Sequence, residues 1–382
     1  MTALIAILLA PFAILTAFFL VEVLAGLRRA QTNAGRRGEQ ASTIVIVPAH
    51  DEEQVIGETL RHLKEALGEG MRILVVADNC SDATGKKSRA AGADVIERSD
   101  PALRGKGHAL AFAVDRLSAE PPDVLIVLDA DCTIDRASLE ALVRSTMESG
   151  RPAQAINLLR PDRSASPLVQ LSTFAFMLKN LVRQRGLQRL AGRVHLTGTG
   201  MAMPFDMFRA SAHVRSSIVE DLALGIELSD RGHPPQLVED AFVWSGSSTE
   251  QGTLTQRRRW EGGFLATAAR YAPRMILRGS VLAGLDLLVP PLALFAALNL
   301  LGLAVAVVLV SAFNGAWWPI FAQALLLAAA GTAVFVAWAR EGRRFVSLAV
   351  LARLPLYVLW KLPMYLGLAR RGAPGEWLRT GR

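Results

Sequence analysis

Both ends of this chain are apolar over lengths that cross a lipid bilayer, and this constrains the fold more than any other feature. The first 21 residues carry no charge, and residues 1–27 contain a single one, Glu22. At about 1.5 Å per residue, such a helix crosses a hydrocarbon core of roughly 30 Å. Basic residues follow the run instead of preceding it, which favours an anchor over a cleaved signal peptide. We predict a transmembrane helix over residues 1–27.

Two more stretches of this kind lie near the other end of the chain. Residues 281–313 contain one charge, Asp286, and a Pro290-Pro291 pair, and residues 319–339 contain no charge. Each is long enough to cross the bilayer, so we predict a transmembrane helix over each. Arginines flank the three predicted spans on one side, which the positive-inside rule assigns to the cytoplasm. They are Arg28, Arg29, Arg36, Arg37, Arg340, Arg343 and Arg344.

Three other stretches mix apolar residues with Lys or Arg. Over residues 345–369, Arg353 and Lys361 are eight positions apart and share one helical stripe. We predict an amphipathic helix in the membrane interface there, with a fourth span as the alternative. A second interfacial helix is predicted over residues 263–279. For residues 168–190, the sequence favours neither an interfacial helix nor ordinary packing against a sheet.

Between the apolar ends, residues 41–262 have the pattern of a soluble α/β domain. β-Branched runs at residues 43–47, 72–77 and 123–128 alternate with amphipathic stretches. This alternation predicts βαβ units in a mostly parallel, Rossmann-like sheet. Ligands of such sheets bind beyond the carboxyl ends of the strands, which is where polar residues gather in this sequence.

The composition excludes several classes of protein. Apolar residues make up 51% of the chain and charged residues 20%, which excludes a disordered chain. Two cysteines are too few for a disulfide scaffold. The net charge of +8 fits an anionic membrane face or a phosphorylated substrate. We expect no nucleic-acid partner, because much of the basic excess flanks the predicted spans and no basic-aromatic stripe occurs.

Two carboxylates, Asp129 and Asp131, follow the third apolar run and are two positions apart. Hard divalent ions take oxygen ligands, often one or two carboxylates together with substrate phosphates. A turn at the end of a strand is the alternative, since such turns are rich in Asp. The position directly after a buried strand favours a site for Mg²⁺ or Mn²⁺.

Three other polar motifs follow or adjoin the predicted strands. Residues 48–53 read Pro-Ala-His-Asp-Glu-Glu, which suits the acidic first turn of a helix or a ligand-binding turn. Asp78 ends the second strand and is either an N-cap or an acceptor of hydrogen bonds from a ligand. Lys106 lies between two glycines, which allow close approach of a phosphate, and a surface turn is the alternative.

Two motifs later in the domain carry residues suited to transfer chemistry. Asp221, preceded by Ser217-Ile-Val-Glu, is either a helix cap or a general base. The run Gln256-Arg-Arg-Arg-Trp260 meets either lipid head groups or a diphosphate, and arginine suits phosphate because its fork donates two hydrogen bonds. The six histidines show no metal-ligand spacing, and each is interpreted as structural.

The order of these motifs resembles that of membrane-bound family-2 glycosyltransferases with the GT-A fold. That family includes cellulose synthases, hyaluronan synthases and bacterial exopolysaccharide transferases. The resemblance covers about residues 43–262 and depends on the motifs occurring in order. One turn differs from the family pattern, because His50 and Asp51 stand where Tyr-Asn is common.

The resemblance implies a role for each motif. Asp131 would hold the metal ion, Asp221 would be the catalytic base, and Trp260 would form the floor of the acceptor site. The loop at residues 197–200 would border the donor sugar. Glu52 and Asp78 would contact the uridine of the donor. The implied donor-binding residues are Pro48, Glu52, Asp78, Lys106, Asp129, Gln256 and Arg259.

The resemblance also implies the reaction. A single displacement of UDP inverts the anomeric centre, so an α-linked UDP-sugar yields a β-glycoside. Three or four membrane helices are too few for a polymer channel, so we expect transfer of one sugar to a membrane-embedded acceptor, either a polyprenyl-diphosphate-linked saccharide or another glycolipid. A processive polysaccharide synthase with partner subunits is the alternative. We expect a multi-pass inner-membrane protein with a cytoplasmic catalytic domain.

Overall fold

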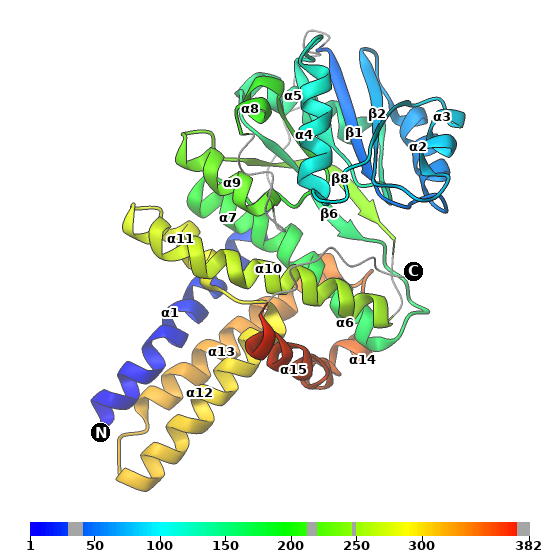
Figure 1. Cartoon of the computed structure of the whole chain (residues 1–382). Coiled ribbons are helices and arrows are strands. Elements are labelled where there is room, and N and C mark those ends of the chain that lie inside the picture. Colours follow the sequence, from blue (N-terminus) through cyan, green and yellow to red (C-terminus); the bar gives the residue numbers. More distant parts are fainter. Residues whose placement is uncertain (30–40, 212–219, 247–249, 373–382) are drawn as a thin grey trace.

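The computed structural model describes residues 1–29, 41–211, 220–246 and 250–372. Within these residues, a sheet domain stands on a layer of oblique helices, and three long helices project from that layer as a bundle (Figure 1). Arg36, Arg37 and residues 217–219, which belong to motifs predicted above, lie outside the described residues.

The first half of the sheet is parallel, as the alternating apolar runs predict. β1 (Thr43–Ala49) lies between β2 (Met71–Asp78) and β4 (Val124–Val127), and β3 (Asp94–Arg98) pairs with β2. The inner strands are nearly continuous runs of Val, Ile and Leu, because both faces of a parallel sheet are covered by helices.

The second half of the sheet is mixed. β7 (Met201–Pro204) runs antiparallel to β4 and to β6 (Ala153–Leu159), while β8 (Gln236–Ser245) runs parallel to β6 and antiparallel to β5 (Cys132–Ile134). The strand order over the described chain is β3-β2-β1-β4-β7-β6-β8-β5. The α/β fold with a mostly parallel sheet is therefore confirmed, with β7 as an antiparallel insertion that the sequence pattern did not predict.

Helices cover both faces of the sheet. α2 and α5 pack on one face, and α4, α8 and α9 pack on the other. In α2, Ile56, Leu60 and Leu63 recur at helical spacing and are buried, which gives that helix a single apolar face. The helices of this domain are α2 (Ile56–Ala66), α3 (Thr84–Ala90), α4 (Lys106–Leu117), α5 (Arg136–Ser149), α8 (Phe205–Ala210) and α9 (Glu220–Asp230).

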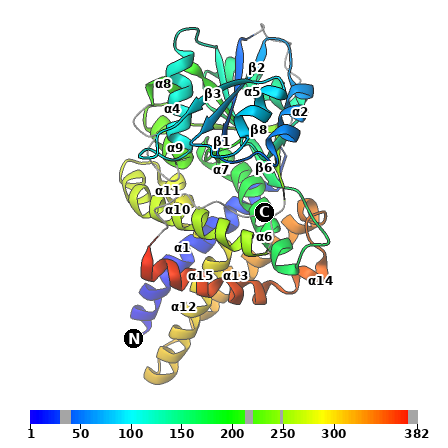
Figure 2. The same ribbon diagram turned by 45° about the vertical axis from the view of Figure 1, so that its right-hand side comes forward.

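A layer of helices separates the sheet from the projecting bundle (Figure 2). Residues 168–190 belong to this layer and pack between β6 and α1, which is the packing against the sheet that the sequence offered as one of two alternatives. The helix expected over residues 263–279 is the second half of a longer helix, α10. The layer contains α6 (Pro167–Met177), a π-helical turn η1 (Leu178–Arg183), α7 (Gln184–Ala191), α10 (Glu250–Leu277), α11 (Val281–Leu288), α14 (Leu348–Leu351) and α15 (Leu354–Arg371).

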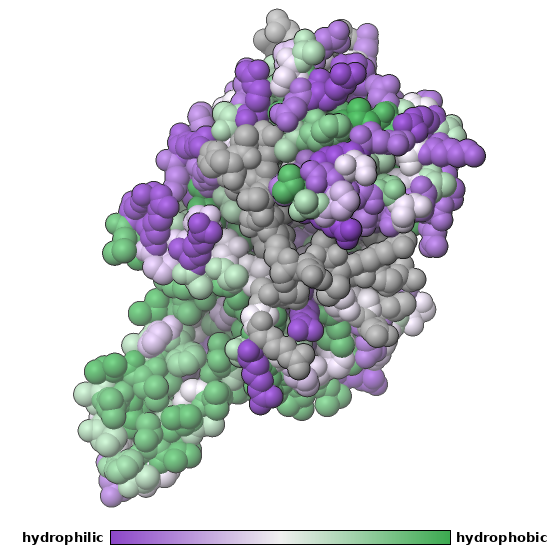
Figure 3. Space-filling view, viewed as in Figure 1, coloured by the Kyte–Doolittle hydropathy of each residue, from purple (hydrophilic) through white to green (hydrophobic). Residues whose placement is uncertain are grey.

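Three of the described helices are long and apolar enough to cross a membrane. They are α1 (Thr2–Gly26), α12 (Leu292–Phe313) and α13 (Trp318–Ala337), which continues as a π-helical turn to Gly342. The face of this bundle that Figure 3 shows is almost entirely hydrophobic. The single helix expected over residues 281–313 is instead two, α11 and α12, because neither residue of the Pro290-Pro291 pair has an N–H to continue the ladder.

Inside the bundle, three polar side chains meet. Gln323 of α13 donates to Asn299 of α12 at 2.7 Å and to Thr16 of α1 at 3.2 Å, and Thr16 donates to Asn299 at 3.2 Å. All three residues are buried. Polar groups in an apolar bundle need partners, so this triad fixes which faces of the three helices pack together.

Two glycines allow α1 of the bundle to cross the η1–α7 segment closely. A methyl group on Gly186 of α7 would lie 2.1 Å from the carbonyl oxygen of Glu22, and one on Gly26 would lie 1.9 Å from that of Val182. Both distances are far shorter than a van der Waals contact. The backbones of α1 and of the η1–α7 segment therefore cross closely only because these positions lack a side chain.

We predict that Gly186→Ala lowers the free energy of unfolding by about 1–3 kcal/mol, because the added methyl group forces α1 and α7 apart. The measurement is thermal denaturation of the full chain in detergent. Gly331→Ala in α13 is the matched control, since a methyl group there meets nothing within 4 Å. Equal melting temperatures for the two variants would contradict the close crossing.

Candidate active site

A cavity of about 900 Å³ lies between the carboxyl edge of the sheet and the helices of the layer beneath it. Its wall contains residues from β1, β2, α4, α9, α10, η1 and α15, and from the segment that follows β4. Every residue to which the sequence motifs assigned a role in substrate or metal binding or in catalysis lines this one cavity. These are Pro48, Glu52, Asp78, Lys106, Asp129, Asp131, Asp221, Gln256, Arg259 and Trp260.

Three of these residues come together because parallel strands end at one edge. Pro48 lies near the end of β1, Asp78 is the last residue of β2, and Asp129 follows β4 by two residues. The crevice beyond the carboxyl ends of such strands is where α/β sheets bind ligands. The strand ends therefore supply one wall of the cavity.

The carboxylate of Asp78 is held by its neighbours. Its Oδ1 atom accepts from Arg98 at 2.6 Å and from Asn79 at 3.2 Å, and its side chain is nearly buried. The ring of His50 bonds to the backbone carbonyl of Asp78 at 2.8 Å. Asp51 has a φ of 53°, a conformation that Asn and Asp adopt more readily than other side chains. Asp in place of the family's Asn is therefore compatible with this turn.

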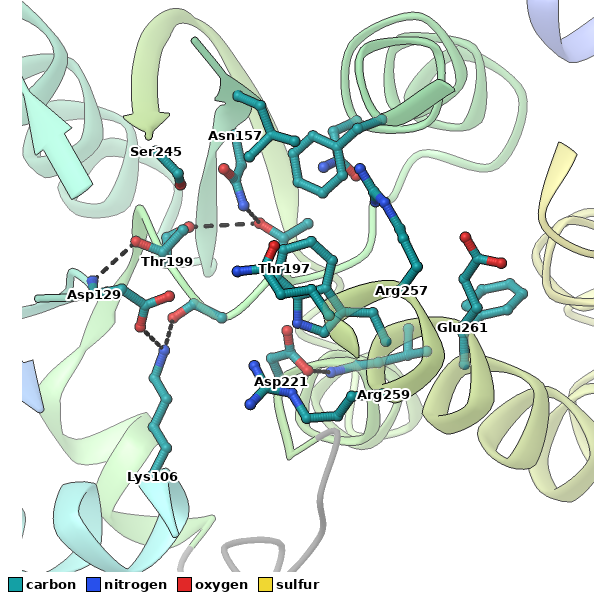
Figure 4. Close-up of a pocket in the computed structure, with 18 of the residues that line it drawn as sticks. Lys106, Asp129, Asn157, Thr197, Thr199, Asp221, Ser245, Arg257, Arg259 and Glu261 are labelled. Carbon is teal, nitrogen blue, oxygen red and sulfur yellow. Dashed lines mark hydrogen bonds and ion pairs between the residues drawn. The ribbon is translucent and has the colours of Figure 1, made fainter. Parts of the chain in front are cut away.

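Lys106 links three segments at the N-terminus of α4. Its Nζ atom pairs with the carboxylate of Asp129 and donates to the carbonyl of Gly198 at 2.6 Å. Gly198 has a φ of 81°, and a methyl group there would lie 3.0 Å from Asp221 Oδ2 and 3.5 Å from Lys106 Nζ. Glycine at this position thus lets the loop at residues 197–200 bring the lysine close to Asp221 (Figure 4).

Asp129 and Asp131 have the donor atoms that a hard cation requires. Together with Cys132 they place three potential ligand atoms within 4.8 Å of one another. Burial raises the pKa of the Cys132 thiol to about 12. Hard divalent ions prefer oxygen to sulfur, so the two carboxylates are the ligands suited to them. Two carboxylates fit Mg²⁺ or Mn²⁺ better than a soft metal.

Asp221 lies at the start of α9, between the two ends of the cavity. Its Oδ1 atom accepts from the backbone N–H of Leu222 at 2.8 Å. Burial raises the pKa of the Asp221 carboxyl above its ordinary value, and that hydrogen bond together with the positive charges of Lys106 and Lys179 opposes the rise. A carboxylate with a raised pKa is a stronger proton acceptor than an ordinary Asp.

One face of α10 forms the opposite wall. Gln256, Arg259 and Trp260 are three and four residues apart, so they lie on adjacent turns of one side of the helix. Arg257 and Glu261 extend this wall away from Asp129 (Figure 4).

Comparison with known proteins agrees with this geometry. Residues 41–263, more than half of the chain, match the model described as "Glycosyltransferase like family 2". The chain belongs to glycosyltransferase family 2. It is 26% identical over 231 residues to a probable glycosyltransferase, YdaM, of Bacillus subtilis, covering 57% of this chain and 54% of that protein. It is 35% identical over 107 residues to the uncharacterized protein MJ1222 of Methanocaldococcus jannaschii, covering 28% and 42%.

The chain therefore spans about half the length of the curated relatives that it matches. Among solved structures, it resembles the mannosyltransferase PcManGT from Pyrobaculum calidifontis in complex with GDP-Man and Mn²⁺, with a TM-score of 0.56 and 17% identity. The similarity covers 95% of this chain and all of that one, and it confirms the GT-A fold.

Sequence reasoning missed several residues of this glycosyltransferase that line the cavity. Lys179, Arg183, His195 and Lys361 were not assigned a role, although each faces the cavity. The one signal in the sequence was the pair Lys179 and Arg183, four residues apart in an otherwise apolar stretch.

Two of these missed residues belong to a buried ionic network. Arg183 pairs with Glu22 of α1 at 2.6 Å and with Asp286 of α11 at 2.5 Å, and Asp286 also pairs with His195. His195 precedes the loop at residues 197–200 by two residues. The network therefore connects a membrane helix of the glycosyltransferase to a wall of its cavity.

We predict that Asp131→Asn weakens Mn²⁺ binding by at least about ten-fold, because it removes a charged oxygen ligand. Calorimetric titration of the metal into the purified glycosyltransferase measures this. Asp135→Asn is the control, since Asp135 caps α5 through Ser138 and does not line the cavity. Unchanged Mn²⁺ affinity in Asp131→Asn would exclude this carboxylate as a ligand.

Proposed function

We propose that this family-2 glycosyltransferase is a metal-dependent, inverting enzyme that transfers a sugar from a UDP-sugar to a lipid-linked acceptor in the membrane. One observation carries the proposal. A single cavity extends from the carboxylates at the sheet edge to helices that pack on the membrane bundle, with Asp221 between its ends. A nucleotide and a lipid can thus reach the same carboxylate from opposite sides.

The donor occupies the sheet end of this cavity. In our proposal, Glu52 and Asp78 contact the uridine, and Lys106 lies beside the diphosphate. Pro48 and Asp129 complete the donor wall. The pair between Lys106 and Asp129 supports this arrangement, because the carboxylate holds the ammonium group at the cavity surface. The structural relative was solved with GDP-Man, so the donor screen should compare UDP-sugars with GDP-mannose.

In our proposal, Asp131 holds the metal ion, because its carboxylate belongs to the cluster of ligand atoms that it forms with Asp129 and Cys132. When bound, Mg²⁺ or Mn²⁺ would neutralise negative charge on the diphosphate leaving group. Gln256 and Arg259 donate hydrogen bonds to that group from the opposite wall. Arginine suits this position because its planar fork matches phosphate oxygens.

Asp221 acts as the general base. Its carboxylate accepts the proton of an acceptor hydroxyl, whose oxygen bonds to the anomeric carbon as the bond from that carbon to UDP breaks. One displacement inverts the anomeric centre, so an α-linked donor yields a β-glycoside. Trp260 supplies an apolar floor on which the acceptor rests.

The arginines near the sheet domain indicate on which side of the membrane that domain lies. Arg28, Arg29, Arg340, Arg343 and Arg344 lie where α1 and α13 meet the sheet domain. By the positive-inside rule, this side of a multi-pass inner-membrane protein faces the cytoplasm. Nucleotide sugars then reach the cavity directly. α15 lies across the end of the bundle, as an interfacial helix does (Figure 2).

We predict that Asp221→Asn lowers sugar transfer by roughly 10²–10⁴-fold while UDP binding is retained, because only the proton acceptor is lost. Transfer is measured as radiolabelled sugar on extracted lipid, and UDP binding by titration calorimetry. Asp230→Asn, at the far end of α9, is the matched control. Full activity in Asp221→Asn would exclude it as the base.

Analysis of the same lipid products by mass spectrometry separates the two product classes. We expect one added sugar per acceptor, because three candidate spans in the described chain leave little room for a polymer channel. A ladder of products would support a processive synthase instead.

We also predict the direction of the pH dependence. The base acts only when deprotonated, and burial raises the pKa of Asp221, so activity is lost as pH falls through that raised pKa. The acid limb of kcat/KM should therefore lie above the ordinary value for Asp of about 4. Rates measured from pH 4 to 9 with constant metal saturation test this, and an acid limb at or below that value would contradict it.

A further inference from the structure

Two cations without a carboxylate partner line the membrane end of the cavity. Lys179 of η1 and Arg257 of α10 both face the cavity, and no acidic side chain of the described chain lies within 4.0 Å of their charged nitrogens. Arg183 nearby is already neutralised by Glu22 and Asp286. Lys179 feels the more distant negative charges of Asp286, Glu261 and Asp221. Within the described residues, neither cation has a carboxylate in direct contact, so both can bind an anion that enters the cavity.

Each of the two cations contacts aromatic rings where the α6–η1 segment packs against α10, at two successive levels along these helices. The ring of Phe176 on α6 lies 5.6 Å from that of Trp260 on α10, and the Arg257 guanidinium lies within 5.3 Å of both ring centres. One turn further along each helix, Lys179 lies 4.5 Å from the ring centre of Phe264. The contact made by Arg257 and the one made by Lys179 are separated by about one helical turn, or ~5.4 Å, which suits a phosphate or diphosphate between the two cations.

The guanidinium of Arg257 is hydrogen-bonded along one edge, through Nε and Nη2. Its Nε donates to Ser172 Oγ at 2.8 Å and its Nη2 to the Ser172 carbonyl at 3.2 Å. Within the described chain, these bonds leave Nη1 without a hydrogen-bond acceptor. A guanidinium that is fixed by serine and by two aromatic rings is ordered before any ligand binds.

Lys179 is exposed, but the space that it faces is the interior of the cavity. The surrounding protein lowers the pKa of its ammonium group by desolvation, and repulsion from Arg183 adds to this. An anion bound beside Lys179 would oppose both effects, because it stabilises the charged ammonium group. The nearest acid on α10, Glu261, is unsuited to this role, because it is engaged by Lys361 and by Tyr365 at 2.7 Å.

We infer that Lys179 and Arg257 bind the phosphate group of the lipid-linked acceptor. This inference rests on the proposed function, since it places the acceptor in the cavity that holds the donor. The donor diphosphate belongs to the other end, beside Asp131 and Arg259. Beyond the two cations, the cavity wall becomes apolar at Phe19 and at residues 289–293, where α11 meets the bundle. A phosphate joined to an apolar chain matches this order of surfaces.

Binding of defined lipids to the full chain in detergent tests the inference. The probes are undecaprenyl phosphate, the uncharged alcohol undecaprenol, and dioleoyl phosphatidylglycerol as a bulk anionic lipid. We expect undecaprenyl phosphate to bind at least ten-fold more tightly than the other two. Lys179→Met and Arg257→Gln should each remove most of this preference, while Lys179→Arg should retain it.

Arg270→Gln is the control, because Arg270 is an exposed arginine of α10 outside the cavity. Melting temperature and UDP binding of each variant show that it is folded. Equal affinity of the wild-type chain for phosphate and alcohol would overturn the inference, and so would equal affinity for phosphatidylglycerol.

Failure of the proposed transferase activity and failure of the phosphate site give different experimental results. If UDP release from every donor is absent but lipid binding depends on Lys179 and Arg257, the proposed transferase activity fails and the phosphate site stands. If sugar is transferred in an Asp221-dependent manner but both cation variants keep wild-type KM for a phosphorylated lipid, the phosphate site fails and the activity stands.

Discussion

The buried ion pairs of Arg183 hold the membrane part and the sugar-transfer part of this protein together. Two carboxylates, Glu22 and Asp286, come from different helices and meet one guanidinium away from water. Removing one partner of such a buried pair typically costs about 3–5 kcal/mol, because an uncompensated charge remains. The position of His195, and hence of the loop after it, depends on the same contacts.

The cavity has two opposite walls, one formed by the sheet edge and the other by the long helix α10. Strand ends of a parallel sheet set the carboxylates of Asp78 and Asp129 on one wall, where their backbones are fixed by ladder hydrogen bonds. α10 supplies arginines and the ring of Trp260 to the facing wall. Residues separated by more than 100 positions thus share one cavity, which extends from the sheet edge to the helices that pack on the apolar bundle.

The parts of this arrangement that sequence predicts are those set by local pattern. Apolar runs predicted the three candidate spans and the parallel strands, and polar residues at strand ends predicted that Asp129, Asp131 and their neighbours line the cavity. Lys179 had no predicted role, and Arg257 was one of three arginines in a basic run. Which of them faces the cavity depends on the rings and acids that lie beside them after folding. The π-helical turn at η1 also changes which residues share a helix face, and nothing in the pattern marks it.

The close crossing at Gly26 and Gly186 leaves no room for a flexible joint between the membrane helix and the catalytic body. In the proposed arrangement, the distance between Asp221 and the lipid surface is therefore set by the fold. A lipid-linked acceptor of the proposed kind must place its hydroxyl at that distance, so the enzyme would select acceptors by the number of sugar and phosphate units between the lipid tail and the reacting oxygen.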